Sequence, residues 1–120
     1  MINIPVSYGE LFDKITILEI KKQEIGSDNV IKELDLLLEK SKNIQVDAEL
    51  LRNLKLVNKI LWDIEDRLRV KEKEKIFDDE FITLARNVYS TNDKRAGIKK
   101  QINTELNSEI VEEKQYVEYE

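Results

Sequence analysis

The sequence predicts an all-α fold of four helices built on a long antiparallel helical hairpin. Only three glycines and one proline occur in 120 residues, so few positions force a helix to end. Charged residues make up 38% of the chain and hydrophobic residues 41%, a balance typical of amphipathic helices. Two segments near 48–75 and 80–107 carry apolar residues at helical spacing; each is about 28 residues long and would span about 42 Å.

The first helix is expected from about residue 8 to residue 24. Ser7 and Glu10 have the spacing of a capping box, in which each side chain bonds the backbone N–H of the other residue. Gly26 marks the end of this helix because glycine readily adopts the left-handed conformation that follows a helix. The residues expected on its inner face are Leu11, Ile15, Leu18 and Ile25.

The second helix is expected from about residue 29 to residue 42, with Ser27 or Asp28 as its N-cap. Its inner face should contain Ile31, Leu34, Leu37 and Leu38. We expect both short helices to pack against the near half of the hairpin. The third helix would then extend beyond them and leave apolar residues uncovered, so the sequence also predicts a homodimer.

The two hairpin helices have different inner faces. The third helix, capped by Asp47, has a continuous apolar stripe formed by Leu50, Leu54, Val57, Leu61, Ile64 and Leu68. The fourth helix, capped by Asp78 or Asp79, begins and ends its stripe with apolar residues: Phe81, Leu84, Ala85, Val88, Ile102 and Leu106. Its middle is different, because polar and cationic residues occupy the positions that should be apolar.

These polar positions make the fourth helix the main candidate for a site. They are occupied by Asn92, Arg95, Lys99 and Asn103. An unpaired buried charge costs several kcal/mol, so these cations must meet carboxylates, water or a ligand. Glu19 and Glu65 are the expected carboxylate partners. Three interpretations remain open: an internal ion-pair network, a groove that binds an anionic group, and a dimer interface in which these groups pair across a two-fold axis.

Further candidates lie along one edge of the apolar stripe of the third helix and beside the polar segment of the fourth. Asn58, Trp62 and Glu65 lie along this edge of the third helix. Tyr89 lies at the edge of the apolar stripe of the fourth helix. A single tryptophan or tyrosine at the edge of a core usually serves packing, and stacking on a ligand ring is the alternative. The predicted ligand-binding set is therefore Arg95, Lys99, Asn92, Tyr89, Asn58, Trp62, Glu65 and Glu19.

Paired carboxylates offer an alternative site for a metal ion. Glu10 and Asp13 have i, i+3 spacing, as do Asp63 and Asp66, and repeated acidic pairs on facing helices bind magnesium in small all-α phosphohydrolases. The second pair points away from the apolar stripe on a helical wheel. With no histidine or cysteine in the chain, neither a Ser-His-Asp triad nor a Cys-His pair can form. No cofactor is expected, and whether the protein is an enzyme stays open.

The charge distribution divides the chain into a helical domain, residues 1–107, and an acidic tail, residues 108–120. Residues 105–120 contain six glutamates and one lysine, which accounts for the whole net charge of −5. The rest of the chain is neutral, so it has no basic field for nucleic acid or anionic lipid. The tail could form a short strand against residues 2–6 or remain solvated. No apolar run long enough for a membrane span and no signal peptide is seen, and the absence of cysteine suits the cytoplasm.

Four blocks of the sequence together resemble a known family. They are residues 4–21 (IPVSYGELFDKITILEIK), 61–66 (LWDIED), 85–96 (ARNVYSTNDKRA) and 112–116 (EEKQY). The chain resembles an uncharacterised family of small helical proteins from bacteria and phages, whose genes sometimes lie near glycosyltransferase or surface-polysaccharide genes. The resemblance implies a site without naming a reaction. It favours a cytoplasmic protein that binds a phosphorylated sugar or a sugar nucleotide. A dimeric interaction module and a magnesium-dependent phosphohydrolase are the alternatives.

Overall fold

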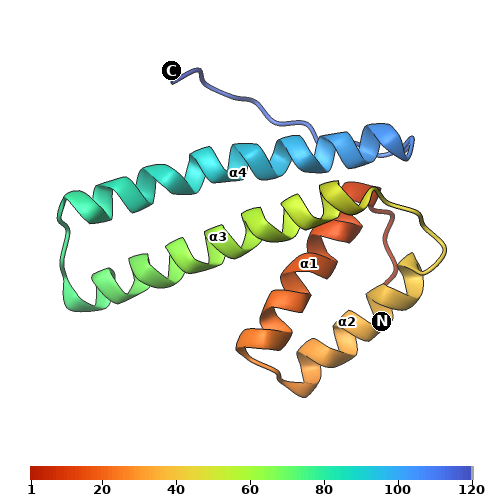
Figure 1. Ribbon diagram of the computed structural model, residues 1–120, viewed down its shortest axis with the longest axis horizontal. Helices are drawn as coiled ribbons and strands as arrows, with labels where there is room; N and C mark the ends of the chain where they lie inside the picture. Colours follow the sequence, from red (N-terminus) through yellow and green to blue (C-terminus); the bar gives the residue numbers. More distant parts are fainter. Residues whose placement is uncertain (120) are drawn as a thin grey trace.

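The computed structural model describes residues 1–119, which form four helices and no strand (Figure 1). The helices are α1 (Tyr8–Glu24), α2 (Asp28–Ser41), α3 (Ala48–Glu74) and α4 (Asp79–Glu105). The predicted all-α class is therefore confirmed. The two long helices run antiparallel and pack against each other more extensively than any other pair, as the predicted hairpin requires (Figure 1).

Each helix begins at a side chain that accepts a hydrogen bond from the first turn. Ser27 caps α2, Asp47 caps α3 and Asp78 caps α4. The Ser7 hydroxyl accepts a bond from the N–H of Glu10 at 3.0 Å, which makes one half of the predicted capping box. The other half was predicted wrongly, because the Glu10 carboxylate binds a lysine of α4 instead. A long-range ion pair has replaced a local bond.

The core lies where α1 meets the other three helices. Its buried members are Phe12, Ile15, Leu18, Leu34, Leu54 and Ile102, with at least one from every helix. Full burial of an aliphatic side chain of this size contributes about 1.5–3 kcal/mol, so this cluster is the main apolar stabilisation of the fold. Within the described residues, α1 is the helix whose backbone packs against all three others.

The packing of α2 differs from the expectation. Its backbone packs against α1 and does not approach α3 or α4 in the described part of the chain. Leu34 is buried, whereas Ile31 and Leu38, predicted to face inward, are exposed. Ile25 is exposed as well, because it lies after the last turn of α1, where Gly26 reverses the chain with a φ of 67°. The buried face of α2 is narrower than the spacing of its apolar residues predicted, because the backbone of one neighbouring helix, α1, packs against it.

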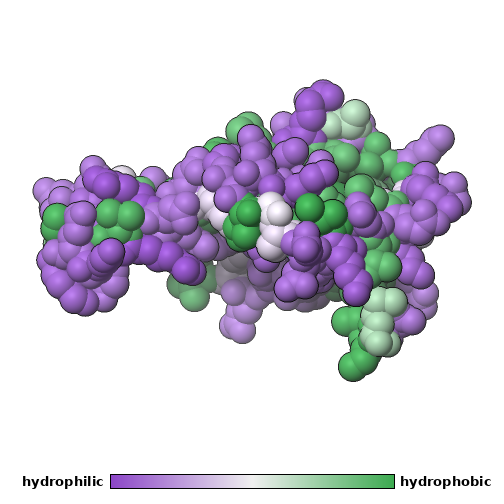
Figure 2. All heavy atoms as spheres, turned by 90° about the horizontal axis from the view of Figure 1, so that it is seen from below, coloured by the Kyte–Doolittle hydropathy of each residue, from purple (hydrophilic) through white to green (hydrophobic). Residues whose placement is uncertain are grey.

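Beyond α1, the hairpin continues as an arm made of α3 and α4 (Figure 1). An ion pair closes its tip: Lys71, with a side chain only 5% exposed, donates to both carboxylate oxygens of Asp78 at 3.0 Å. The rings of Phe77 and Phe81 meet edge to face, with 5.2 Å between their centroids. Figure 2 shows a mostly hydrophilic arm, with apolar side chains gathered at the other end of the molecule. None of the helices described is long and apolar enough to cross a membrane.

The C-terminal tail reverses direction and runs back along α4 (Figure 1). Asn107 adopts a left-handed conformation with φ 52°, and the N–H of Ser108 then bonds the carbonyl of Asn103 at 2.8 Å. Residues 108–119 form no strand, so the strand pairing with residues 2–6, one of the two alternatives for the tail, does not occur. The tail instead meets α4 through side chains, as the contact between the rings of Tyr119 and Tyr89 at 5.1 Å shows.

Candidate functional site

The N-terminus of α1 is pressed against α4 at Gly9. Its N–H donates to the Asn103 side-chain oxygen at 2.7 Å. A Cβ added at Gly9 would lie 2.6 Å from the backbone oxygen of Lys99 and 3.0 Å from the Asn103 side chain. Only a residue without a side chain permits this approach. The approach of α1 to α4 places the carboxylates of the first helix against the cations of the fourth.

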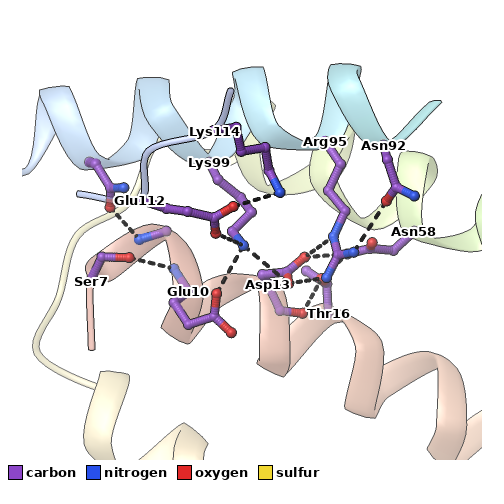
Figure 3. A network of polar contacts seen from close by, with 12 residues as sticks. Ser7, Glu10, Asp13, Thr16, Asn58, Asn92, Arg95, Lys99, Glu112 and Lys114 are labelled. Carbon is purple, nitrogen blue, oxygen red and sulfur yellow. Dashed lines mark hydrogen bonds and ion pairs between the residues drawn. The ribbon is translucent and has the colours of Figure 1, made fainter. Parts of the chain in front are cut away.

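Asp13 is the centre of the polar network that results (Figure 3). Its side chain is 1% exposed, and it accepts bonds from Arg95 Nε at 2.9 Å and from Asn58 Nδ2 at 3.0 Å, with a second bond from Arg95 Nη2. Asn58 also donates to the Thr16 hydroxyl at 2.9 Å. Burial, the largest single influence, would raise the pKa of Asp13, but the bonds from Arg95 and Asn58 and the charge of Lys99 together lower it.

Lys99 is the second buried charge, and it is held by three carboxylates. Its ammonium group lies 2.9 Å from Glu10, 3.3 Å from Glu112 and 3.7 Å from Asp13. Burial has the largest single effect and would lower the pKa of Lys99, but these carboxylates outweigh it and raise the pKa. Lys99 is therefore a permanent cation at neutral pH.

Arg95 joins the network to the surface. Its hydrogen bonds with Asp13 are the main reason that the pKa of Arg95 is raised, and a weaker bond of 3.4 Å connects it to the Asn92 side chain. The arginine side chain is 28% exposed, so its outer edge is open to solvent. A guanidinium in this position can bind an anion while remaining paired with its carboxylate.

Glu112 of the tail completes the site from outside. Its carboxylate lies between two ammonium groups, 3.3 Å from Lys99 and 2.7 Å from Lys114 (Figure 3). Lys114 first, and then Lys99, lowers the pKa of Glu112 below its ordinary value. The Glu112 side chain is 42% exposed, whereas that of Asp13 is buried. The tail thus supplies an ionised but accessible carboxylate to a cation at the core.

Hollows of the surface follow the tail along α4. One of them has a volume of about 490 Å³. Its lining includes Gly97, Lys99, Asn103, Glu112, Lys114 and Tyr116. A second hollow of about 200 Å³ is lined by Asn92, Arg95, Ala96, Lys99, Glu112 and Lys114. The polar middle of α4 is therefore both paired with carboxylates and open to hollows of the surface.

The structure brings four of the predicted binding residues together: Asn58, Asn92, Arg95 and Lys99. The carboxylate partners were predicted wrongly. Glu19 lies 3.6 Å from Lys55, and Glu65 is exposed on α3 and takes no part in the hydrogen bonds and ion pairs described for the network. The register between α1 and α4 decides this, because it places Glu10 and Asp13 opposite the cations. Trp62 is half-buried on α3 and does not appear among the described hydrogen bonds of the network, while Tyr89 contacts the tail.

Several residues of the network were missed or assigned to other chemistry. Glu10 and Asp13 share one face of α1, which is the signal that suggested a metal site, and the same spacing places both opposite Lys99. Asp63 is exposed and pairs with Lys59 at 2.9 Å. Within residues 1–119, no three acidic side chains come together as a possible metal-binding group. Glu112 belongs to the sequence block 112–116, but its contact with Lys99 was not predicted, because that contact depends on the reversal at Asn107.

Comparison with known families gives one match, which covers residues 2–119 and describes a family of unknown function, DUF6165. The chain belongs to this family. Comparisons with curated proteins and with solved structures found no match. Membership of DUF6165 therefore agrees with the small helical family that the four sequence blocks resemble, and it carries no activity with it.

Proposed function

We propose that the protein binds an anionic small molecule in the groove between α4 and the C-terminal tail. The observation that supports this most directly is the position of Glu112 between Lys99 and Lys114. Two ammonium groups that converge on one accessible carboxylate form a site that an external anion can occupy in its place. Arg95 and Asn92 line the adjacent hollow and supply further donors.

Phosphorylated sugars and sugar nucleotides are the ligand class that we propose. A phosphoryl group offers several charged oxygens to Lys99 and Lys114 and suits a site with more than one cation. The larger hollow of about 490 Å³ adds Asn103 for hydroxyl groups and Tyr116 as an apolar wall. The resemblance to proteins encoded near surface-polysaccharide genes suggests the same class. With it we propose a bacterial or phage origin and a cytoplasmic location.

The test is a titration that compares two lysines of equal charge. Lys114→Ala removes one cation from the groove, whereas Lys73→Ala removes one from the exposed end of α3. Calorimetry with a hexose 1-phosphate should show binding to the parent protein and to Lys73→Ala, and weakening by about tenfold in Lys114→Ala, as expected for one lost charge-assisted bond. Equal affinities in both variants, or no heat with the parent, would refute the proposal.

A second candidate is a homodimeric interaction module. Leu56 and Ile60 lie one turn apart on the same side of α3 and are 59% and 41% exposed. We propose that a second copy covers this side, in which case the polar network would serve to hold the register of the helices. Light scattering would then give about twice the mass of 14.2 kDa, and Leu56→Glu should return the protein to the monomer mass. A monomer mass for the parent protein would refute this candidate.

A further inference from the structure

The two hollows beside Arg95 and Gly97 share one wall. Four residues line both of them: Ala96, Lys99, Glu112 and Lys114. Ala96 and Lys99 belong to α4, and Glu112 reaches in from the tail to contact Lys99 (Figure 3). The Glu112 carboxylate therefore lies at the boundary between a smaller hollow near Arg95 and a larger one near Gly97 and Tyr116.

The three carboxylates on Lys99 differ in how easily they can leave. Glu10 and Asp13 belong to α1, and the packing of Gly9 against the backbone of α4 holds that helix in place. Glu112 belongs to a segment without helix or strand in which residues 109–119 are all exposed. Its departure exposes no apolar core and breaks two ion pairs, one of them between surface groups. Glu112 is thus the exchangeable carboxylate of the site.

We propose that Glu112 is an intramolecular competitor that occupies the anion position and keeps one elongated ligand groove divided in two. A phosphate monoester displaces the Glu112 carboxylate from Lys99 and Lys114, and the rest of the molecule lies in the larger hollow. This inference rests on the proposed function. It names the ligand class as an elongated molecule with a terminal phosphoryl group, and it makes the tail a regulator of affinity.

A competitor within the same chain lowers the apparent affinity by the fraction of molecules in which the site is free. If Glu112 fills the position in about nine molecules out of ten, its removal strengthens binding about tenfold. The same substitution would weaken binding if Glu112 contacted the ligand or if it were needed to hold the groove open. The sign of the effect therefore distinguishes a competitor from a binding residue or a structural one.

The experiment uses Glu112→Gln, with Glu109→Gln as the matched control, in the full chain. Both glutamates belong to the exposed tail and both changes remove one negative charge, but Glu112 lines the two hollows and Glu109 lines neither. Amide chemical shifts are followed during titration with inorganic phosphate and with glucose 1-phosphate. Glu112→Gln should bind both about tenfold more tightly than the parent, and the affinity of Glu109→Gln should remain within about twofold of the parent's.

The outcomes separate this inference from the proposed function. If the parent binds and Glu112→Gln binds with equal or lower affinity, the competitor is refuted while the anion site stands. If glucose 1-phosphate binds Glu112→Gln no more tightly than inorganic phosphate, the larger hollow does not hold the body of the ligand. If neither probe binds the parent or either variant, the proposed function fails and the inference fails with it. Thermal unfolding of each variant verifies that the fold is retained.

Discussion

Asp13 and Arg95 are joined by a two-point ion pair although they lie 82 residues apart in the sequence. One end is a buried carboxylate on the first helix and the other a half-buried guanidinium on the last. A pair of this kind must form together with the helix packing, since either charge alone in the interior is costly. The pair therefore couples the position of α1 to that of α4.

Asp13→Asn should strongly destabilise the fold. The change leaves Arg95 and Lys99 without their shared buried carboxylate, and removing one partner of a buried ion pair costs about 3–5 kcal/mol. Urea unfolding monitored by circular dichroism measures the loss. Asp63→Asn is the control, because Asp63 is exposed and solvent screens its pair with Lys59, so its loss should change the stability little. Similar losses in the two variants would show that the Asp13 network does not stabilise the protein.

Stability should fall in acid because of Asp13. The folded state lowers the pKa of Asp13 below its ordinary value of 3.8, so the unfolded chain binds a proton more readily than the folded protein does. The resulting stabilisation is complete above the unfolded pKa and is lost as the pH falls through the folded one. Melting temperatures measured between about pH 2 and 6 should therefore decline below about pH 4. Asp13→Asn should show a shallower decline, and a parallel curve would contradict this assignment.

Two glycine-to-alanine changes should have opposite effects on the stability of the fold. Gly9→Ala places a methyl group 2.6 Å from the backbone oxygen of Lys99, so α1 must shift and the protein should lose about 1–3 kcal/mol. Gly97→Ala meets no atom within 4 Å and lies inside α4, where alanine favours the helix by about 1 kcal/mol. Urea unfolding measures whether each variant is more or less stable than the parent protein. A stabilised Gly9→Ala would show that the close approach of α1 to α4 is not required.

The hairpin tip should open locally when Lys71 is removed. Lys71 bonds both oxygens of Asp78 and lies 3.3 Å from Glu80, while Asp78 also caps α4 through the N–H of Phe81. Lys71→Met removes the cation and retains much of the apolar stem. Hydrogen exchange should then accelerate at residues 76–82 and remain unchanged in the core around Leu54 and Ile102. Uniform acceleration along the whole chain would indicate a global effect instead.

The acid response of the tip has the same sign as that of the core. The bond from the N–H of Phe81, followed by the one from Lys71, lowers the pKa of Asp78, and Arg67 followed by Lys71 lowers the pKa of Glu80. Both carboxylates therefore stabilise the tip fully at pH values above their ordinary pKa values of 3.8 for Asp78 and 4.5 for Glu80. This stabilisation is lost as the pH falls through their lowered pKa values in the folded protein. After correction for the pH dependence of the intrinsic exchange rate, amide hydrogen exchange at residues 76–82 should accelerate in acid. The acceleration should be smaller in Lys71→Met than in the parent protein.

The helices and their caps could be read from local sequence. Ser27, Asp47 and Asp78 cap helices because a short polar side chain can satisfy N–H groups only a few residues away. The buried stripe of Leu54, Val57, Leu61 and Ile64 follows from the same local geometry. The polar middle of α4 was also visible, since cations in apolar positions break the helical pattern.

The partners of those cations could not be read from the sequence. Glu19 and Glu65 lie near covered faces on their own helices, but the contact between α1 and α4 at Gly9 determines which carboxylates meet Arg95 and Lys99. A helical wheel contains no information about the register between two helices. The contact of Glu112 depends further on the left-handed turn at Asn107. The sequence by itself determined the helices and located the buried cations. Tertiary structure alone decided their partners, because ion pairing across 82 residues follows from helix packing.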